Sequence, residues 1–216
     1  MLENTKMNVM NNLNLSAKDK LLRIGTELMT SQGFASTPLD KLLKQSGVPK
    51  GSFYHHFGSK TGFGLAVIES YNEFFQHQLN KQFLNAELTP IERLKAFVSS
   101  AANGMHKYDF QRGCLIGNLG QEISALDEEF RKAIETIFNQ WADMTCELFE
   151  QGKQAGQVVS VANSYQLAQT FWIGWEGAVL RAKLQQSAAP LYLFFNQFMS
   201  SRNFLEEYPF DESDFN

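Results

Sequence analysis

Side chains that can hydrogen-bond the base edges or phosphate oxygens of DNA gather in one short stretch of this 216-residue chain. The stretch covers residues 46–60, and its polar members include Lys50, Ser52, Tyr54 and His55. Val48, Phe53 and Phe57 are spaced to lie on one side of a helix, so the polar side chains project elsewhere. Gly51 would let the backbone approach a duplex closely. The pattern indicates a helix with a core face and a partner face, although a merely solvated polar face has the same pattern.

The residues just before this stretch have the signals of another short helix. Thr37 can cap its start, Pro38 suits the first helical position, and Asp40 lies near the positive end of the helix dipole. Gly47 can take the positive φ needed where a helix stops and turns. The apolar stripe of this helix consists of Leu39, Leu42 and Leu43. Pro49 suits the opening of the next helix, so we expect two short helices joined by a glycine-bearing turn.

From about residue 18 to residue 60 the chain resembles the DNA-binding domain of the TetR (tetracycline-repressor-like) family of bacterial transcription regulators. The resembling segments are 24–34, 39–47, 48–57 and the final Ser59-Lys60, and the run 51–57 is the most specific part. The resemblance implies that the second short helix enters the major groove of DNA. It places Lys50, Gly51, Ser52 and His55 nearest the bases, Tyr54 and His56 nearest the backbone, and Thr37 and Lys60 on phosphates.

Two features depart from the family pattern. Pro49 lies where many relatives carry a polar cap, and Gly62 and Gly64 replace the acidic and strongly helix-forming residues that are common after the lysine. Glycine lowers the propensity of a helix interior. The start of the following helix is therefore expected to be weaker than in those relatives.

Charge is distributed unevenly along the chain, although the net charge is only −4. Residues 1–60 hold 8 Lys and Arg against 4 Asp and Glu, a net charge of +4, so the remainder has a net charge of −8. A basic quarter can bind phosphates while the acidic remainder is repelled, which would orient the protein on DNA. Terminal segments also vary by a few charges without any function, so this asymmetry counts only together with the helix pattern.

The hydrophobic content of 44% is that of a folded protein, and no apolar run is long enough to cross a bilayer. The N-terminus lacks the order of a signal peptide. Two cysteines, Cys114 and Cys146, fit a reducing cytoplasm and form no CxxC metal-binding spacing. We therefore expect a cytoplasmic protein with no membrane partner.

Apolar residues recur at helical spacing along most of the chain, and we find no strand pattern and no internal repeat. The expected helices are one from Ser16 to Gly33, the two short ones, one from Ser59 past Leu79, one from Pro90 to 105–108, a short glycine-interrupted one after Cys114, and those at 127–152, 163–185 and 188–201. The sequence thus predicts an all-α protein. Its expected parts are a flexible arm (1–15), a helix-turn-helix domain (16–60), a ligand-binding and dimerisation domain (61–202) and an acidic, mobile tail (203–216).

The last two expected helices carry a surplus of large apolar side chains, namely Leu167, Phe171, Trp172, Trp175, Leu191, Tyr192, Phe194, Phe195 and Phe198. One helix pair cannot cover all of them, although some can fill the core of a single subunit. Two copies that form a four-helix interface would cover them. A two-fold dimer would place two recognition helices roughly 34 Å apart, about one turn of DNA, and would match a palindromic operator.

The middle of the chain has the composition of a small-molecule pocket. Aromatic side chains from several helices would line it, with a few polar anchors among them. The residues concerned are Tyr71, Phe75, Trp141, Trp172 and Trp175, with His106, Asn118 and Gln121 as the polar groups. Each residue alone fits an ordinary core equally well.

Cys114 is the sharper candidate for sensing an effector. Arg112 and the free N–H groups of a following helix would lower its pKa and favour the thiolate, which suits a sensor of electrophiles or oxidants. A buried, inert cysteine is the alternative. The stretch Gly113-Cys114-Leu115 is similar to the family branch that responds to reactive carbonyls and acrylate-like compounds. Cys146, within an apolar helical run, is expected to be structural.

These features together predict a homodimeric, ligand-responsive repressor of transcription that binds double-stranded operator DNA and uses no cofactor. A small molecule or electrophile would shift it to a form with the wrong spacing between recognition helices. A helical-bundle enzyme or carrier is the alternative, but the sequence shows no triad or metal-ligand spacing for one. A metal sensor that uses His106 and Cys114 is a third interpretation.

Overall fold

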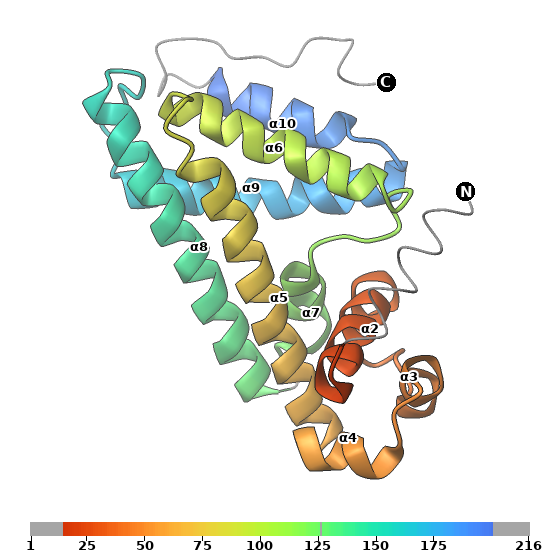
Figure 1. Ribbon diagram of the computed structural model, residues 1–216. Helices are drawn as coiled ribbons and strands as arrows, with labels where there is room; N and C mark the ends of the chain where they lie inside the picture. The colour runs from red at the N-terminus through yellow and green to blue at the C-terminus, as the bar shows by residue number, and fades with distance from the viewer. Residues whose placement is uncertain (1–14, 126, 201–216) are drawn as a thin grey trace.

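The computed structural model describes residues 15–125 and 127–200, which form nine α-helices and no strand (Figure 1). The all-α prediction is confirmed. The helices are α2 (Ala17–Gln32), α3 (Leu39–Ser46), α4 (Lys50–Phe57), α5 (Lys60–Phe83), α6 (Pro90–His106), α7 (Leu115–Ile123), α8 (Glu128–Gln154), α9 (Ser164–Gln185) and α10 (Ala189–Met199). The predicted arm, apart from Leu15, and the predicted tail lie outside the described residues.

Local caps determine where several helices begin. The Ser16 side chain accepts the N–H of Asp19 at the start of α2, at 3.1 Å. At the start of α6, Thr89 Oγ1 accepts the N–H of Glu92 while Glu92 Oε2 accepts the N–H of Thr89, which makes a reciprocal capping box. Because these signals lie within four residues of one another, the sequence alone placed these helix starts within one residue.

The helices α2, α3 and α4 and the first turns of α5 pack around Phe53, which is fully buried. The Phe53 ring lies 5.4 Å from that of Phe57 and 5.2 Å from that of Phe63, between ring centres. Gly47 ends α3 with a φ of 65° and donates its N–H to the carbonyl of Leu43. The two short helices and their glycine-bearing turn are present as predicted.

The start of α3 differs from the prediction at Thr37. The helix begins at Leu39, and no side chain caps it. The Thr37 hydroxyl donates instead to the carbonyl of Gly33 at 2.6 Å and accepts a bond from Gln32 Nε2 at 3.3 Å. Because the end of α2 lies within hydrogen-bonding distance of this hydroxyl, Thr37 stabilises the turn between α2 and α3 and does not cap α3.

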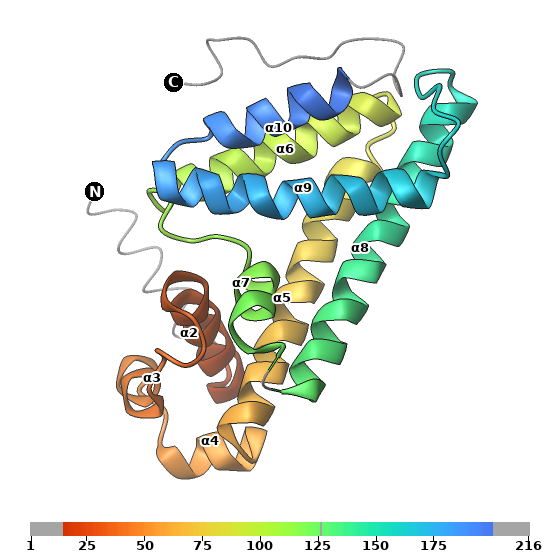
Figure 2. The same ribbon diagram turned by 180° about the vertical axis from the view of Figure 1, so that it is seen from behind.

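In the larger part of the molecule, α5 and α8 run lengthwise beside each other, and α6, α9 and α10 cross their far ends as a layer (Figures 1 and 2). The short α7 lies at the junction, against α2, α5 and α8. The helix α5 belongs to both parts, because its first turns pack on Phe53 and its later turns on α6 and α8. Within the described ranges, no helix is long and apolar enough to span a membrane.

The glycines early in α5 allow close packing. A Cβ at Gly62 would collide with the carbonyl oxygen of Phe57, and one at Gly64 would lie 2.6 Å from ring atoms of both Phe34 and Phe130. The Phe34 and Phe130 rings touch each other over this glycine, with centres 5.1 Å apart. The departure of these positions from the family pattern therefore has a steric reason: the backbone at the end of α4 occupies the space beside Gly62, and side chains from α8 and from the turn after α2 occupy the space beside Gly64.

The large apolar residues of α9 and α10 mostly face the core of one subunit. Of the nine in the predicted surplus, eight are buried and Phe194 is half-buried. A different set is exposed on these two helices: Ile173 is 78% exposed, Leu184 68%, Leu193 59% and Leu180 43%. The apolar surface left for a second copy is therefore a row of aliphatic side chains and not the aromatic surplus, because the aromatic rings fill the space between α6, α8 and α9.

Candidate DNA-binding and effector sites

The exposed face of α4 carries most of the side chains predicted to contact DNA. Lys50, Gly51, Tyr54, His55 and His56 are exposed, and Ser52 is half-buried. The opposite face of the helix is anchored, since Phe53 and Phe57 are buried in the small domain, which consists of α2, α3, α4 and the first turns of α5. The helix lies at one end of the molecule, far from α9 and α10, so its polar face is open to a partner (Figure 1). A rigid helix with a free polar face suits insertion into a major groove.

The two residues predicted to hold phosphates differ in accessibility. Lys60 begins α5 and is half-buried, with its ammonium 4.7 Å from the centre of the Phe34 ring. Thr37 is only 2% exposed, and its hydroxyl is already bonded within the turn after α2. The structure contradicts the phosphate role of the Thr37 side chain, because a hydroxyl buried in this way does not reach a phosphate.

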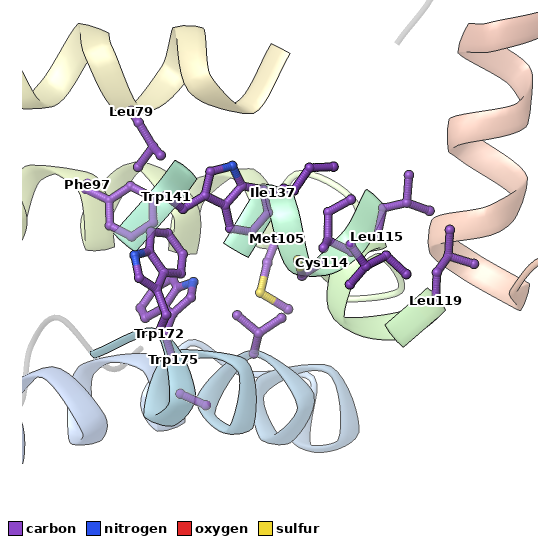
Figure 3. Close-up of a cluster of buried hydrophobic side chains, with 14 of the residues drawn as sticks. Leu79, Phe97, Met105, Cys114, Leu115, Leu119, Ile137, Trp141, Trp172 and Trp175 are labelled. Carbon is purple, nitrogen blue, oxygen red and sulfur yellow. The ribbon is translucent and has the colours of Figure 1, made fainter. Parts of the chain in front are cut away.

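The three tryptophans predicted to line a pocket form the centre of the aromatic core (Figure 3). Trp141 is fully buried and donates its indole N–H to Asn72 Oδ1 at 2.8 Å, and Trp172 donates to Thr145 Oγ1 at 3.0 Å. Trp175 stacks on Phe171 with ring centres 5.8 Å apart. Their polar atoms serve internal bonds, which indicates a structural role for Trp141 and Trp172 in particular.

The predicted polar anchors do not converge. His106 is exposed at the end of α6, where its ring meets that of Phe110. Gln121 is exposed on α7, and Asn118 on the same helix donates to the carbonyl of Thr30 in α2 at 3.2 Å. No group of three His, Cys, Asp or Glu side chains within residues 15–125 and 127–200 is arranged to hold a metal ion. His106 and Asn118 therefore do not act as a shared site with the tryptophans.

Cys114 caps the N-terminus of α7, where its Sγ atom accepts the N–H of Gly117 at 3.4 Å. The thiol is buried, and burial, followed by the nearby carboxyl of Glu176, holds its pKa well above the ordinary value. Arg112 does not offset this effect, because it pairs with Glu27 at 3.8 Å and lies 3.9 Å from the centre of the Tyr108 ring. The prediction of a lowered pKa is wrong, since desolvation of a thiolate outweighs the helix N–H groups.

Glu176 is a titratable residue at this site that the sequence analysis did not single out. It reaches from α9 to the first turn of α7, where a Cβ on Gly117 would collide with its Oε2 atom. Burial raises the pKa of its carboxyl to about 7, opposed in part by a hydrogen bond with the Cys114 thiol. Tyr71 of α5 completes the group: burial first, and then Cys114 and Glu176, raise the pKa of its phenol well above the usual value. We call Tyr71, Cys114 and Glu176 the buried polar cluster: Cys114 is buried as a whole residue, and Tyr71 and Glu176 are half-buried, with the Oε1 atom of Glu176 closed to solvent.

A signal for Glu176 was present in the sequence. It is the single charged residue in the run from Phe171 to Leu180, and a lone carboxylate among apolar helical residues is either exposed or functional. Helical spacing alone does not show whether Glu176 is exposed or faces the interior, because this depends on which helices pack against α9.

The far end of α7 holds the small domain. Glu122 accepts the backbone N–H of Phe34 and that of Ala35, and Asn118 binds the end of α2 one turn earlier. Cys114, Asn118 and Glu122 are four residues apart and therefore lie along one face of the helix. One rigid element thus connects the buried polar cluster to the domain that carries α4.

A helix-turn-helix with an open polar face, joined through α5 and the short α7 to a larger domain with a buried polar cluster, defines a DNA-binding protein with a separate regulatory domain. Comparison with family models agrees. Residues 21–67 match the model for bacterial regulatory proteins of the tetR family, and residues 90–198 match that for the tetracyclin repressor-like C-terminal domain.

Similar proteins cover almost the same span. The transcriptional regulator AcuR of Cereibacter sphaeroides is 44% identical over 84% of this chain and 83% of its own length. The HTH-type transcriptional repressor NemR of Escherichia coli is 30% identical over 81% of this chain and 87% of its own length.

Solved structures extend the comparison to the fold. A regulatory protein TetR from Rhodobacter sphaeroides superposes with a TM-score of 0.83 at 43% identity, covering 88% of this chain and 99% of that one. The reduced form of E. coli NemR gives a TM-score of 0.78 at 28% identity, covering 89% of this chain and all of that one. The chain belongs to the tetR family of bacterial regulatory proteins: it is a DNA-binding regulator of transcription and not an enzyme.

Proposed function

We propose that this protein is a cytoplasmic repressor that leaves its operator when a small molecule binds the larger domain. The observation that carries this proposal is the open polar face of α4, which is held by the buried Phe53 and Phe57 on its other side. Repression is supported by two relatives whose names describe transcriptional repressors, DhaR of a Mycobacterium and NemR of E. coli.

The base contacts are assigned to Lys50, Gly51, Ser52 and His55, and the backbone contacts to Tyr54 and His56. Lys50 is the first residue of α4 and has a long, exposed donor side chain, which suits the oxygen and nitrogen acceptors of guanine. Lys60 is assigned to a phosphate, since its ammonium lies at the start of α5 beside the end of α4. Thr37 is left out of this set because its side chain is buried.

A homodimer would bind a palindromic operator through two copies of α4. The exposed aliphatic row on α9 and α10 is the surface for the second copy. A dimer binds two half-sites of the operator only when its two recognition helices are about one turn of DNA apart. An effector that changes the distance between the two copies of α4 would therefore control DNA binding.

The effector would act through α7. This helix is capped by Cys114 at the buried polar cluster and bound at its other end to the backbone after α2. A molecule that binds better when α7 is shifted would stabilise an arrangement in which the small domain is turned away from its DNA-binding position. It would weaken DNA binding by the ratio of its affinities for the two arrangements. Non-covalent binding is the favoured mode, since the raised pKa of Cys114 leaves little thiolate at neutral pH.

The DNA-binding part is tested by fluorescence anisotropy with promoter DNA from beside the gene and with shuffled DNA. The Lys50→Ala variant should lose about 1–3 kcal/mol of binding to the promoter and much less to shuffled DNA. The Lys81→Ala variant, at the other end of α5, is the control. Equal affinity of the wild type for both DNAs, or an equal loss for both on substitution, would contradict sequence-specific contact by Lys50.

The mode of sensing is tested by adding a mild thiol-reactive electrophile to the same complex, with Cys114→Ser in parallel. We expect that the electrophile releases neither the wild type nor the Cys114→Ser variant from the promoter DNA within the time in which a thiol of low pKa would react. Prompt release of the wild type alone would instead establish covalent sensing at Cys114.

A further inference from the structure

The last turn of α2 carries no cation of its own. The carbonyls at the end of a helix have no partner within that helix, and they form the negative end of the helix dipole. In α2 the last turn contains no basic residue, and Thr30 within it is buried. A buried carbonyl needs a hydrogen-bond donor, so the end of α2 needs donors from another part of the chain.

The larger domain supplies these donors from two helices. The ammonium of Lys183 in α9 lies 3.5 Å from the carbonyl oxygens of both Thr30 and Ser31. Asn118 in α7 donates its amide to the same Thr30 carbonyl at 3.2 Å. The stem of Lys183 passes beside Gly113, where a Cβ would lie 3.7 Å from Lys183 Cδ. A cation that is 152 and 153 residues away in sequence thus lies at the negative end of the α2 dipole.

Lys183 also lies next to the surface assigned to the second copy. It follows Leu180 by three residues and precedes Leu184 by one, and both leucines belong to the exposed aliphatic row on α9 and α10. Residues three apart are neighbours on a helix surface. The C-terminal end of α9 lies on the side of the larger domain nearest to α2 (Figures 1 and 2). One helix end therefore contacts the small domain of its own subunit and flanks the surface for the partner subunit.

The distance between two copies of α4 depends on how firmly each small domain is held relative to that surface. Glu122 holds the small domain to α7, and α5 runs from one part of the molecule into the other. The aliphatic row lies on neither of these helices. A rotation of the small domain about them would displace α4, which lies at the end of the molecule, more than α2 (Figure 1). A contact made by α9 itself restrains this rotation from the helix that carries the row.

We propose that Lys183 is a positioning residue for DNA binding: its contact with the end of α2 fixes the small domain to α9 and so sets the distance between the two recognition helices of the dimer. This inference rests on the proposed function and names a residue that controls it. Without the ammonium, the end of α2 loses a donor and the small domain samples more positions. Only part of the dimers then present both copies of α4 at the distance of one DNA turn, and the apparent affinity falls by that fraction.

Double electron–electron resonance on the dimer of the whole chain measures this distance directly. A spin label is attached to Gln45→Cys, an exposed position in α3, in a Cys146→Ser background that keeps the buried Cys114. The same background without Gln45→Cys is the blank for any label on Cys114. Lys183→Met removes the ammonium and keeps a long side chain. Arg181→Met removes the same charge from an exposed position two residues earlier and is the matched control.

The distance distribution of Lys183→Met should be at least about twice as broad as that of the wild type, because the small domain then samples several positions. The distribution of Arg181→Met should be unchanged. Light scattering and circular dichroism of the same samples show that each variant is a folded dimer.

Promoter binding separates positioning from a simple loss of stability. Fluorescence anisotropy compares the promoter DNA with the same DNA lengthened by one base pair at the centre of the operator. Lys183→Met should bind the promoter about three- to tenfold more weakly and should discriminate less between the two DNAs, because its recognition helices adapt to the altered spacing. A variant that is only less stable would lose affinity for both DNAs alike.

Four results would overturn the proposal: a Lys183→Met distribution as narrow as that of the wild type, an equal broadening in Arg181→Met, unchanged discrimination between the two DNAs, or a folded Lys183→Met monomer. The last result would place Lys183 in the dimer contact itself. A wild type that is monomeric or does not bind promoter DNA would instead refute the proposed function.

Discussion

The carboxylate of Glu122 in α7 accepts the backbone N–H of Phe34, just after α2, at 2.8 Å. Its other oxygen accepts the N–H of Ala35 at 2.7 Å. Gly33 makes this approach possible, since its φ is 86° and a Cβ there would lie 2.6 Å from Glu122 Oε2. Two charge-assisted bonds to consecutive amides, 87 and 88 residues away in sequence, thus fasten the small domain to α7.

Replacement of Glu122 by glutamine should loosen this junction. The glutamine offers one oxygen instead of two and turns an amide donor toward an N–H, so we expect the free energy of unfolding to fall by about 1–3 kcal/mol. We also expect an effector to weaken DNA binding by a smaller factor, because α7 then transmits less of its movement. Urea unfolding and anisotropy with and without effector measure both quantities. The exposed Glu150→Gln should change neither quantity. An unchanged stability of Glu122→Gln would show that the hydrogen bonds of Glu122 do not hold the small domain against α7.

Lys60→Ala should weaken binding to all DNA sequences alike. If its ammonium binds one phosphate, the slope of log K against log salt concentration should become smaller by about one unit. Titrations of promoter and shuffled DNA at several salt concentrations measure this slope. Lys81→Ala removes the same charge from the other end of α5 and should leave the slope unchanged. A loss restricted to the promoter sequence would show that Lys60 reads bases instead.

Ile173→Glu should break the dimer. The side chain is 78% exposed in one subunit, and a charge placed within an apolar contact between two copies would lose its hydration without a partner. Light scattering after size exclusion should show a monomer, and promoter affinity should fall by at least tenfold because a single α4 remains per particle. Leu84→Glu changes another exposed apolar residue, which is 68% exposed at the end of α5, and serves as the control. If the Ile173→Glu protein is still a dimer, the dimer interface does not include Ile173.

Stability should depend on pH through Glu176. The folded pKa of about 7 lies above the ordinary value of 4.5, so the folded protein holds the proton more tightly than the unfolded chain. The stabilising effect of protonation is complete below pH 4.5 and is lost as pH rises through 7, with a total of about 3 kcal/mol. Chemical unfolding at pH 5, 6, 7 and 8 should show this loss in the wild type and a smaller one in Glu176→Gln. Equal pH profiles would contradict a buried neutral carboxyl.

Local sequence signals were sufficient for most of the helices and for the exposed polar face of α4. The capping box of Thr89 and Glu92, the left-handed Gly47 and the alternation of Phe53 and Phe57 with polar residues all act within one or two helical turns. The physics of such signals depends little on the rest of the chain. The sequence itself therefore determined the all-α class, the helix-turn-helix and the open face of α4.

The cluster of Tyr71, Cys114 and Glu176 depended on contacts that no local pattern contains. Glu176 reached Cys114 and Tyr71 only because α9 crosses the start of α7, and this crossing reversed the expected pKa shift of Cys114. Thr37 lost its predicted role when the end of α2 took up its hydroxyl, and the aromatic residues expected at a dimer interface filled the subunit core. Helical periodicity reports which residues share a face, but desolvation, charge and burial depend on what packs against that face, and only the tertiary structure decided this.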